Sequence, residues 1–159
     1  RFGYLCFPGL NCIELHNGVG KVCSNTGLMG RWQTIQQHPH VVCDTGHNVG
    51  GWQYLSRQLA MVKCEKMHIV FGMVNDKDID SVLELLPKQA IYYFTKANTK
   101  RALNEQSVRL LAVNHGISGS CYPSVDEAYS AAMEQAGDND FVFIGGSSYV
   151  VGDFLKKCF

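Results

Sequence analysis

From residue 40 onward, short runs rich in Val, Ile, Phe and Tyr alternate with stretches whose apolar residues recur at helical spacing. The runs are almost continuously apolar, which is typical of strands that are buried on both faces of a parallel sheet. The predicted strands are His40–Asp44, His68–Met73, Ala90–Thr95, Gly119–Tyr122 and Asp140–Gly145.

The stretches between these strands carry apolar stripes with the period of an α-helix. The stripes consist of Trp52, Leu55, Leu59 and Val62; Ile79, Val82, Leu83 and Leu86; Val125, Ala128 and Ala132; and Val151, Phe154, Leu155 and Cys158. Residues that favour the N-cap position stand at Asn48, Asp78, Asn104, Ser124 and Ser147. This alternation of strand and helix predicts a Rossmann-like α/β domain, with a mostly parallel sheet and helices on both of its faces.

The region before the first parallel strand has a different pattern. Two β-type runs, Arg31–Gln36 and His40–Asp44, are separated by only three residues, too few for a parallel crossover. We therefore expect an N-terminal antiparallel β-hairpin. A turn about Gln37 and His38 would place Arg31 directly opposite Asp44, with both side chains on one face of the sheet. Asp44 also ends the first parallel strand, at the edge where α/β folds bind ligands.

The first 29 residues do not continue the strand–helix alternation. Leu15, Val19 and Val22 indicate a short helix, which two interspersed glycines weaken, and Asn25–Gly27 is typical of a turn or linker. We interpret residues 1–29 as the tail of a preceding domain with its linker, and residues 30–159 as one domain, with the boundary near Met29. The chain has no initiator Met, which is consistent with its being part of a longer protein.

Composition narrows the function classes. The 159 residues are 46% hydrophobic, and 14 basic side chains balance 14 acidic ones. A net charge of zero shows no excess of basic residues of the kind that binds nucleic acid or an anionic membrane. No apolar run approaches the roughly 20 residues that span a bilayer. Seven cysteines are scattered without a C-x-x-C or Cys/His cluster, which favours reduced, structural thiols in a cytoplasmic protein over a disulfide framework or a zinc site.

Polar residues gather in the turns that follow the first and last parallel strands. Asp44, His47 and Asn48 place a carboxylate, an imidazole and a capping amide in one turn, and Gly145–Ser148 has small residues that let a ligand approach the backbone. Both turns precede a helix N-terminus, which favours anions. The alternative is structural: Asp44 paired with Arg31, Asn48 and Ser147 as helix caps, and a tight turn at the glycines.

Two further segments have some features of ligand sites. In the loop Gly72–Asp78, Asp76 and Asp78 are able to bind a cation or orient Lys77, or to serve as solvated cap residues. Gly18–Lys21 lacks the spacing of a phosphate-binding loop, because Leu15 stands where a glycine is needed and Val22 where Ser or Thr should ligate Mg²⁺. The sequence therefore contains no phosphate-binding loop and predicts no metal-ligating residues of its own.

Four segments together resemble a known family. Gly30–Gln33, Asp44–Asn48, Gly72–Asp78 and Gly146–Ser147 occur in the order and spacing of the C-terminal domain of folylpolyglutamate synthase / dihydrofolate synthase, a branch of the Mur ligase superfamily. The resemblance covers the chain from Met29 to its last residue. It implies a Mur ligase C-terminal domain-like fold and an ATP-dependent amide ligase, which forms an acyl phosphate on a folate carboxylate and then adds L-glutamate.

The resemblance also assigns roles. The residues matching Arg31 and Asp44 bind ATP, and those matching His47 and Ser147 bind the incoming glutamate. Arg31 does supply a fixed cation for phosphoryl charge, and a helix N-terminus at Ser147 does suit a carboxylate. The phosphate loop, the Mg²⁺ ligands and the pocket for folate or dihydropteroate are expected in a preceding ATPase domain of the same chain, so these residues alone are predicted to be inactive.

Three interpretations remain open at this point. The first is the folate enzyme, monomeric and with dihydrofolate synthase activity undecided. The second is another Mur-type ligase, which adds an amino acid to a cell-wall nucleotide precursor. The third is a non-catalytic α/β module that binds a small ligand at its strand ends. Sequence upstream of Arg1 distinguishes the first two, because the acceptor site lies there.

Overall fold

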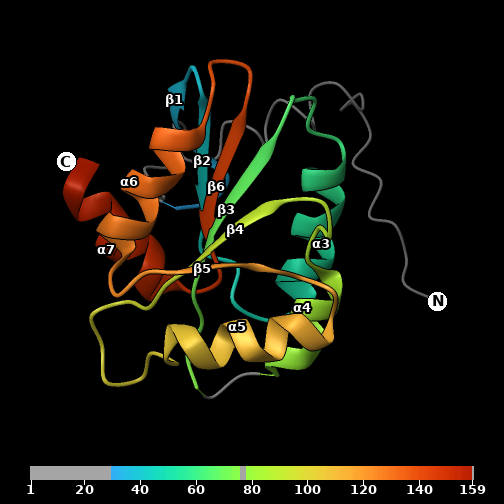
Figure 1. The fold of residues 1–159 in the computed structure, drawn as a ribbon, viewed down its shortest axis with the longest axis vertical. Coiled ribbons are helices and arrows are strands. Elements are labelled where there is room, and N and C mark those ends of the chain that lie inside the picture. Colours follow the sequence, from blue (N-terminus) through green and yellow to red (C-terminus); the bar gives the residue numbers. More distant parts are fainter. Residues whose placement is uncertain (1–29, 76–77, 159) are drawn as a thin grey trace, which may run out of the picture.

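The computed structural model describes residues 30–75 and 78–158, which form one six-stranded sheet and five α-helices (Figure 1). The strands are β1 (Gln33–Gln37), β2 (His40–Asp44), β3 (Met67–Phe71), β4 (Ile91–Phe94), β5 (Gly119–Cys121) and β6 (Phe141–Gly145). The helices are α3 (Val49–Ala60), α4 (Ile79–Leu85), α5 (Glu105–Asn114), α6 (Val125–Gln135) and α7 (Ser148–Cys158). The predicted helix near Val19 and the predicted boundary near Met29 lie outside the described residues.

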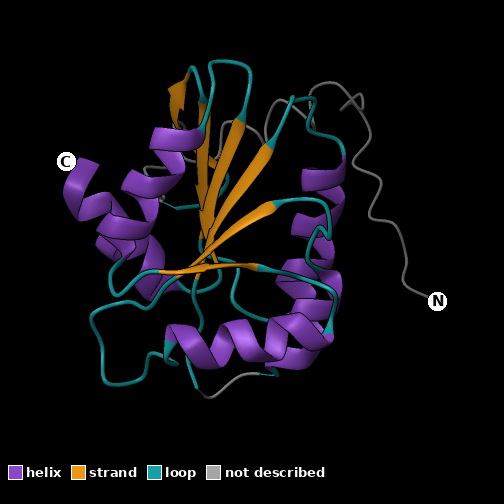
Figure 2. Cartoon of the chain, viewed as in Figure 1, coloured by secondary structure: helices purple, strands orange, loops and turns teal. Residues whose placement is uncertain are grey.

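The sheet has the strand order β1-β2-β6-β3-β4-β5, and only β1 runs antiparallel to its neighbour. Helices α3, α4 and α5 cover one face, and α6 and α7 cover the other (Figure 2). The predicted Rossmann-like α/β fold with an N-terminal hairpin is therefore confirmed. Among the described residues, none of the helices is long and apolar enough to cross a membrane.

Each central strand contributes alternate side chains to two separate cores. In β6, Phe143 packs under α3 with Trp52 of that helix, whereas Ile144 packs against α7 with Phe154. All five residues of β6 are buried, which explains why its sequence is apolar at every position rather than at every second one. The two cores fix β6 between β2 and β3, and with it the positions of the turns that follow these three strands.

The predicted register of the hairpin is wrong. Arg31 was expected opposite Asp44, but β1 begins only at Gln33, which pairs with Cys43, and a bulge shifts the register between Thr34 and Gln36. The strands reverse through His38 and Pro39, joined by a cis peptide bond, rather than through Gln37 and His38. Counting positions along a sequence reveals neither the place of the turn nor the extra residue of a bulge.

All five predicted N-caps are confirmed. The side chains of Asn48, Asp78, Asn104, Ser124 and Ser147 each accept a hydrogen bond from a backbone N–H in the first turn of the helix that follows.

One helix, α5, had a predicted cap but no predicted apolar stripe. Its exposed Leu110 and Val113 interrupt the apolar pattern that the buried Val108 and Ala112 would otherwise make.

The amino ends of the central strands contain a closed polar network. His68 is fully buried, and its two ring nitrogens lie 2.9 Å from the Tyr93 hydroxyl and 3.2 Å from Asp140 Oδ2. Asp140 also accepts hydrogen bonds from the backbone N–H groups of Lys66 and Gly137. This network ties the turn before β6 to β3 and β4, and every member has its partner within the protein.

Candidate functional site

The polar turns predicted from sequence meet at the carboxyl edge of the sheet. Gly145 of β6 pairs with Asp44 of β2 on one side and with Phe71 of β3 on the other. The turns that follow these strands are therefore neighbours. Their close approach requires glycine at two positions, because a Cβ on Gly72 would collide with the Thr95 carbonyl, and Gly146, at φ +102°, has the Gly72 carbonyl where its Cβ would lie.

Asp44 organises the first of these turns. Its side chain is only 7% exposed, and both carboxylate oxygens accept backbone hydrogen bonds of 2.7 Å, Oδ2 from Trp32 N–H and Oδ1 from Gly46 N–H. Trp32 takes a positive φ of 41° at this point, which is an uncommon conformation for a side chain of its size. Backbone strain at Trp32 thus accompanies the orientation of its N–H toward the carboxylate.

The electrostatics of Asp44 are those of a buried charge that is only partly compensated. Burial raises the pKa of its carboxyl group, while the hydrogen bonds from Gly46 and Trp32 and the positive charge of Arg31 act in the opposite direction. Each oxygen keeps a further lone pair with which to accept a hydrogen bond. Asp44 is therefore a buried anion able to receive hydroxyl or N–H donors from a ligand at the sheet edge.

Arg31 lies near Asp44, although not as its strand partner. It is exposed in the bend that precedes β1, and the neighbouring Trp32 donates its N–H to the Asp44 carboxylate. The guanidinium is close enough for its charge to lower the pKa of the Asp44 carboxyl. The structure thus brings this predicted pair together through the irregular start of the hairpin.

His47 lies half-buried in the same turn, just before α3. Its Nδ1 is 3.0 Å from the Thr45 carbonyl oxygen, and because a carbonyl only accepts, Nδ1 carries the hydrogen. The imidazole orientation is therefore fixed by the turn itself. Nε2 is the nitrogen that this contact leaves to a ligand, as an acceptor in the neutral ring and as a donor in the protonated one.

Ser147 is the residue immediately before α7 and is only 2% exposed. Its Oγ accepts a hydrogen bond from Val150 N–H at 3.2 Å, and its carbonyl accepts one from Val151 N–H at 3.2 Å. The hydroxyl therefore caps the helix as an acceptor. A carboxylate at this position would be bound by the hydroxyl hydrogen and by N–H groups of the first helical turn.

The third strand-end loop is described in part. Asp78 is a cap residue: Oδ1 accepts from Ser81 N–H, and the hydrogen bonds from Ser81 lower the pKa of its carboxyl. Asp76 and Lys77 lie outside the described residues. Within residues 30–75 and 78–158, no group of three or more His, Cys, Asp or Glu side chains is arranged to hold a metal ion.

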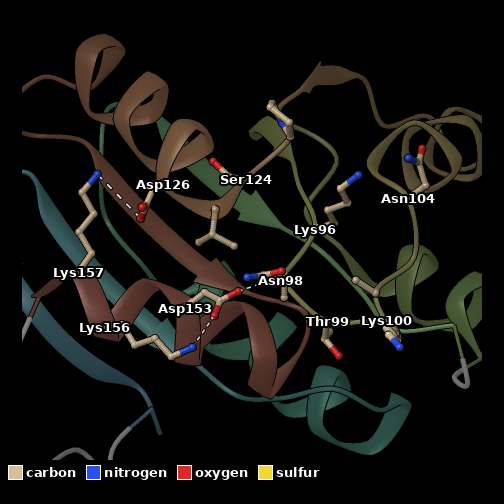
Figure 3. A pocket seen from close by; sticks show the side chains of 14 residues that line it. Lys96, Asn98, Thr99, Lys100, Asn104, Ser124, Asp126, Asp153, Lys156 and Lys157 are labelled. Atoms are coloured by element: carbon tan, nitrogen blue, oxygen red, sulfur yellow. Dashed lines mark hydrogen bonds and ion pairs between the residues drawn. The ribbon is translucent and has the colours of Figure 1, made fainter.

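The loop after β4 lies along the same edge and borders a hollow of about 990 Å³ between α6 and α7 (Figure 3). Four lysines line the hollow: Lys96, Lys100, Lys156 and Lys157. Three of them have carboxylate partners, Lys96 with Glu105, Lys156 with Asp153 and Lys157 with Asp126. Sequence reasoning did not identify this loop as part of the edge.

Comparison with known proteins decides the family. The model of the Mur ligase, glutamate ligase domain, matches residues 30–148, which include Arg31, Asp44, His47 and Ser147. The chain belongs to this family. The match spans every strand of the described sheet, so the resemblance inferred from four short segments is confirmed and extends from β1 to β6.

Individual relatives point to the folate branch. A dihydrofolate synthase/folylpolyglutamate synthase of Buchnera aphidicola subsp. Schizaphis graminum is 27% identical over 158 residues, which are 96% of this chain and 36% of that protein. An Escherichia coli FolC structure in complex with DHPP and ADP superposes with a TM-score of 0.74 at 29% identity, covering 82% of this chain and 31% of that one.

A third relative is the bifunctional folylpolyglutamate synthase/dihydrofolate synthase of Yersinia pestis, solved with AMPPNP and Mn ion. It has a TM-score of 0.73 at 28% identity and covers 82% of this chain and 31% of that one. The glutamate ligase domain described here thus spans about a third of the length of the relatives it matches.

Proposed function

We propose that this chain is the C-terminal, glutamate-binding domain of an ATP-dependent folylpolyglutamate synthase, with dihydrofolate synthase as a second activity to be tested. The observation that carries the proposal is the pairing of β2 with β6, which sets the Asp44–Asn48 turn beside the Gly145–Ser148 turn within a glutamate ligase domain. A cation, a buried carboxylate, an imidazole and a helix N-terminus come together there. This combination suits a phosphorylated nucleotide and an acidic amino acid.

In the proposed reaction, ATP transfers its γ-phosphoryl group to a folate carboxylate, giving an acyl phosphate and ADP. The amino group of L-glutamate then attacks the acyl carbon, and inorganic phosphate leaves as the amide bond forms. Catalysis of this kind depends mainly on positioning and on stabilising charge. The residues of this domain serve both needs.

The nucleotide side consists of Arg31 and Asp44. Arg31 is exposed and always charged, so it is suited to contact phosphate oxygens. The Asp44 carboxylate, held by Trp32 N–H and Gly46 N–H, is suited to accept hydrogen bonds from nucleotide hydroxyls. The divalent ion that accompanies ATP would be held by the preceding ATPase domain, where the family resemblance places its ligands.

The amino-acid side consists of His47 and Ser147. The helix N-terminus at Ser147 would hold the α-carboxylate of glutamate. The Nε2 atom of His47 would contact the amino group, accepting a hydrogen bond from it when the imidazole is neutral. Together they would orient the amine toward the acyl phosphate that the other domain presents.

The test is an assay of the whole protein that carries these residues. Purified protein should incorporate labelled L-glutamate into a reduced folate, and release phosphate stoichiometrically, only when ATP and a divalent cation are both present. The same assay with dihydropteroate as the acceptor tests the dihydrofolate synthase activity. ATP-independent glutamate incorporation, or ligation of glutamate to a nucleotide precursor in place of a folate, would overturn the proposal.

A further inference from the structure

The loop between β4 and α5 is anchored on both sides. Toward β3, the Asn75 N–H donates to the Arg101 carbonyl at 2.9 Å, the Leu103 N–H donates to the Met73 carbonyl at 2.8 Å, and Val74 and Ala102 form a β-bridge. Toward α7, the Asn98 N–H donates to Asp153 Oδ2 at 2.7 Å. The backbone at Arg101 is therefore held at the carboxyl edge of the sheet, beside the β3 turn.

The side chain of Arg101 reaches toward the start of α7. Its Nη1 lies 3.5 Å from the hydroxyl of Tyr149, a residue 48 positions away in sequence and two positions after Ser147. Tyr149 is 40% exposed, and Arg101 is exposed. A guanidinium thus lies next to the helix N-terminus that, in the proposed function, holds glutamate.

Glutamate needs two carboxylate contacts and one amine contact if an enzyme is to select it over neutral amino acids. Ser147 and the first turn of α7 supply one anion site, and His47 supplies the amine contact. Arg101, whose guanidinium contacts the hydroxyl of Tyr149 two residues after Ser147, supplies a cation for the other carboxylate. Arginine matches a carboxylate because its planar fork donates two parallel hydrogen bonds.

We propose that Arg101, positioned by Tyr149, binds the side-chain carboxylate of the incoming L-glutamate and so determines the amino-acid specificity of this site. The proposal rests on the proposed function and goes beyond it, since neither Arg101 nor Tyr149 belongs to the motifs that indicated the family. This contact would make the site prefer glutamate to amino acids without a side-chain charge, because binding one of those would leave an unpaired polar group in the site, which is costly.

The neighbouring Lys100 provides a matched control. It carries the same charge, is exposed on the same loop and lines the hollow between α6 and α7. If only the general positive potential of the loop attracted glutamate, loss of either charge would have a similar effect. If a directed contact is responsible, only loss of the Arg101 guanidinium will matter.

The experiment measures steady-state kinetics of the whole protein with L-glutamate, and with L-glutamine as acceptor or competitive inhibitor. Arg101→Met should raise the KM for glutamate by tenfold to a hundredfold, leave the KM for ATP within twofold, and lower the preference for glutamate over glutamine at least tenfold. Arg101→Lys should be intermediate, because it keeps the charge and loses the fork. Tyr149→Phe should raise the KM for glutamate several-fold, and Lys100→Met should change it less than twofold.

Three outcomes would overturn the inference. Equal losses for glutamate and glutamine in Arg101→Met would show that the guanidinium does not bind the side-chain carboxylate. Equal effects of Lys100→Met and Arg101→Met would show that only the loop's overall charge acts. A wild-type protein that ligates no glutamate overturns the proposed function with it, whereas unaltered selectivity in an active Arg101→Met enzyme overturns this inference alone; thermal melting of each variant confirms that it is folded.

Discussion

The two edges of the sheet each bury an aspartate, and the two aspartates have different partners. At the amino edge, Asp140 accepts hydrogen bonds from Lys66 N–H and Gly137 N–H and pairs with His68, whose other nitrogen contacts Tyr93. At the carboxyl edge, Asp44 accepts from two backbone N–H groups, its neighbour Arg31 is exposed, and His47 is half-buried. A polar group whose partners all lie within the fold stabilises structure, whereas one that faces an open edge is available to a ligand.

The same contrast is seen in the pKa values. Burial raises the pKa of the Asp44 carboxyl, and the opposing hydrogen bonds and the Arg31 charge do not cancel it. At Asp140, burial acts in the same direction, but the hydrogen bonds from Gly137, His68 and Lys66 outweigh it and lower the pKa. The amino edge thus stabilises its charge, and the carboxyl edge holds a charge that a ligand can stabilise further.

The largest expected effect is on stability at the amino edge. Asp140→Ala removes the acceptor for the fully buried His68 and for the part-buried backbone N–H groups of Lys66 and Gly137. An unsatisfied buried group costs about 1–3 kcal/mol, and each of the other two hydrogen bonds contributes less, so the free energy of unfolding should fall by about 3 kcal/mol. Asp44→Ala should lower the free energy of unfolding by less. The charge of that carboxylate is only partly stabilised in the folded protein, and the turn that holds it is partly exposed to solvent. Urea unfolding of both variants makes the comparison, and equal losses would remove the distinction between the edges.

The next effect is on glutamate binding at the carboxyl edge. Losing a hydrogen bond to a charged group costs about 1.5–3 kcal/mol, so His47→Ala and Ser147→Ala should raise the KM for glutamate about tenfold to a hundredfold. The KM for ATP should change less in both variants. Ser124→Ala is the control for Ser147→Ala, because it removes the N-cap of α6 at a similar cost in stability. A larger loss of ATP affinity than of glutamate affinity would reassign His47 and Ser147.

A smaller effect is expected at Arg31. Arg31→Ala removes one exposed cation from the nucleotide side, and the KM for ATP should rise roughly tenfold, in line with the loss of a single charge-assisted hydrogen bond. Arg57→Ala, an exposed arginine in the last turn of α3, serves as the matched control. An unchanged KM for ATP in Arg31→Ala would place the nucleotide elsewhere.

The smallest effect is a difference in pH dependence. Because the folded pKa of Asp140 is lowered, its contribution to stability is present above the ordinary value of 3.8 and is lost as the pH falls through the folded pKa. The raised pKa of Asp44 has the opposite sign, so its contribution is present below 3.8 and is lost as the pH rises. Between pH 3 and pH 7, Asp140→Asn should become more destabilising relative to wild type, and Asp44→Asn less so. Parallel curves for the two variants would contradict the assigned directions.

Much of the fold was predictable because its signals are local. The strand His40–Asp44 was predicted with the bounds observed, and every predicted cap holds its helix. The register of the hairpin was not predicted correctly, since it depends on a bulge between Thr34 and Gln36 that leaves no pattern in the sequence. The apolar stripe of α5 was not recognised in the sequence, because two other apolar residues of this helix, Leu110 and Val113, are exposed.

The site was predictable to the extent that it lies at strand ends. Asp44, His47 and Ser147 lie at or just after the ends of predicted parallel strands, and such ends share one edge of the sheet, so their place at that edge was predictable. The strand order that makes β2 and β6 neighbours was not predicted. Trp32 was missed as a site residue because it acts through its backbone N–H at a positive φ. Arg101 was missed because its link to Tyr149 joins two loops that only the strand order brings together.

The central claim is that ligands bind at the carboxyl edge, through the turns at 44–48 and 145–149. Amide hydrogen exchange of the whole protein, with and without a non-hydrolysable ATP analogue, a reduced folate and L-glutamate, tests it most directly. The account predicts slower exchange at Trp32, Gly46 and Val150 on ligand binding, with no change at Lys66 or Gly137 in the amino-edge network. Protection confined to the amino edge, or absent from both turns, would contradict it.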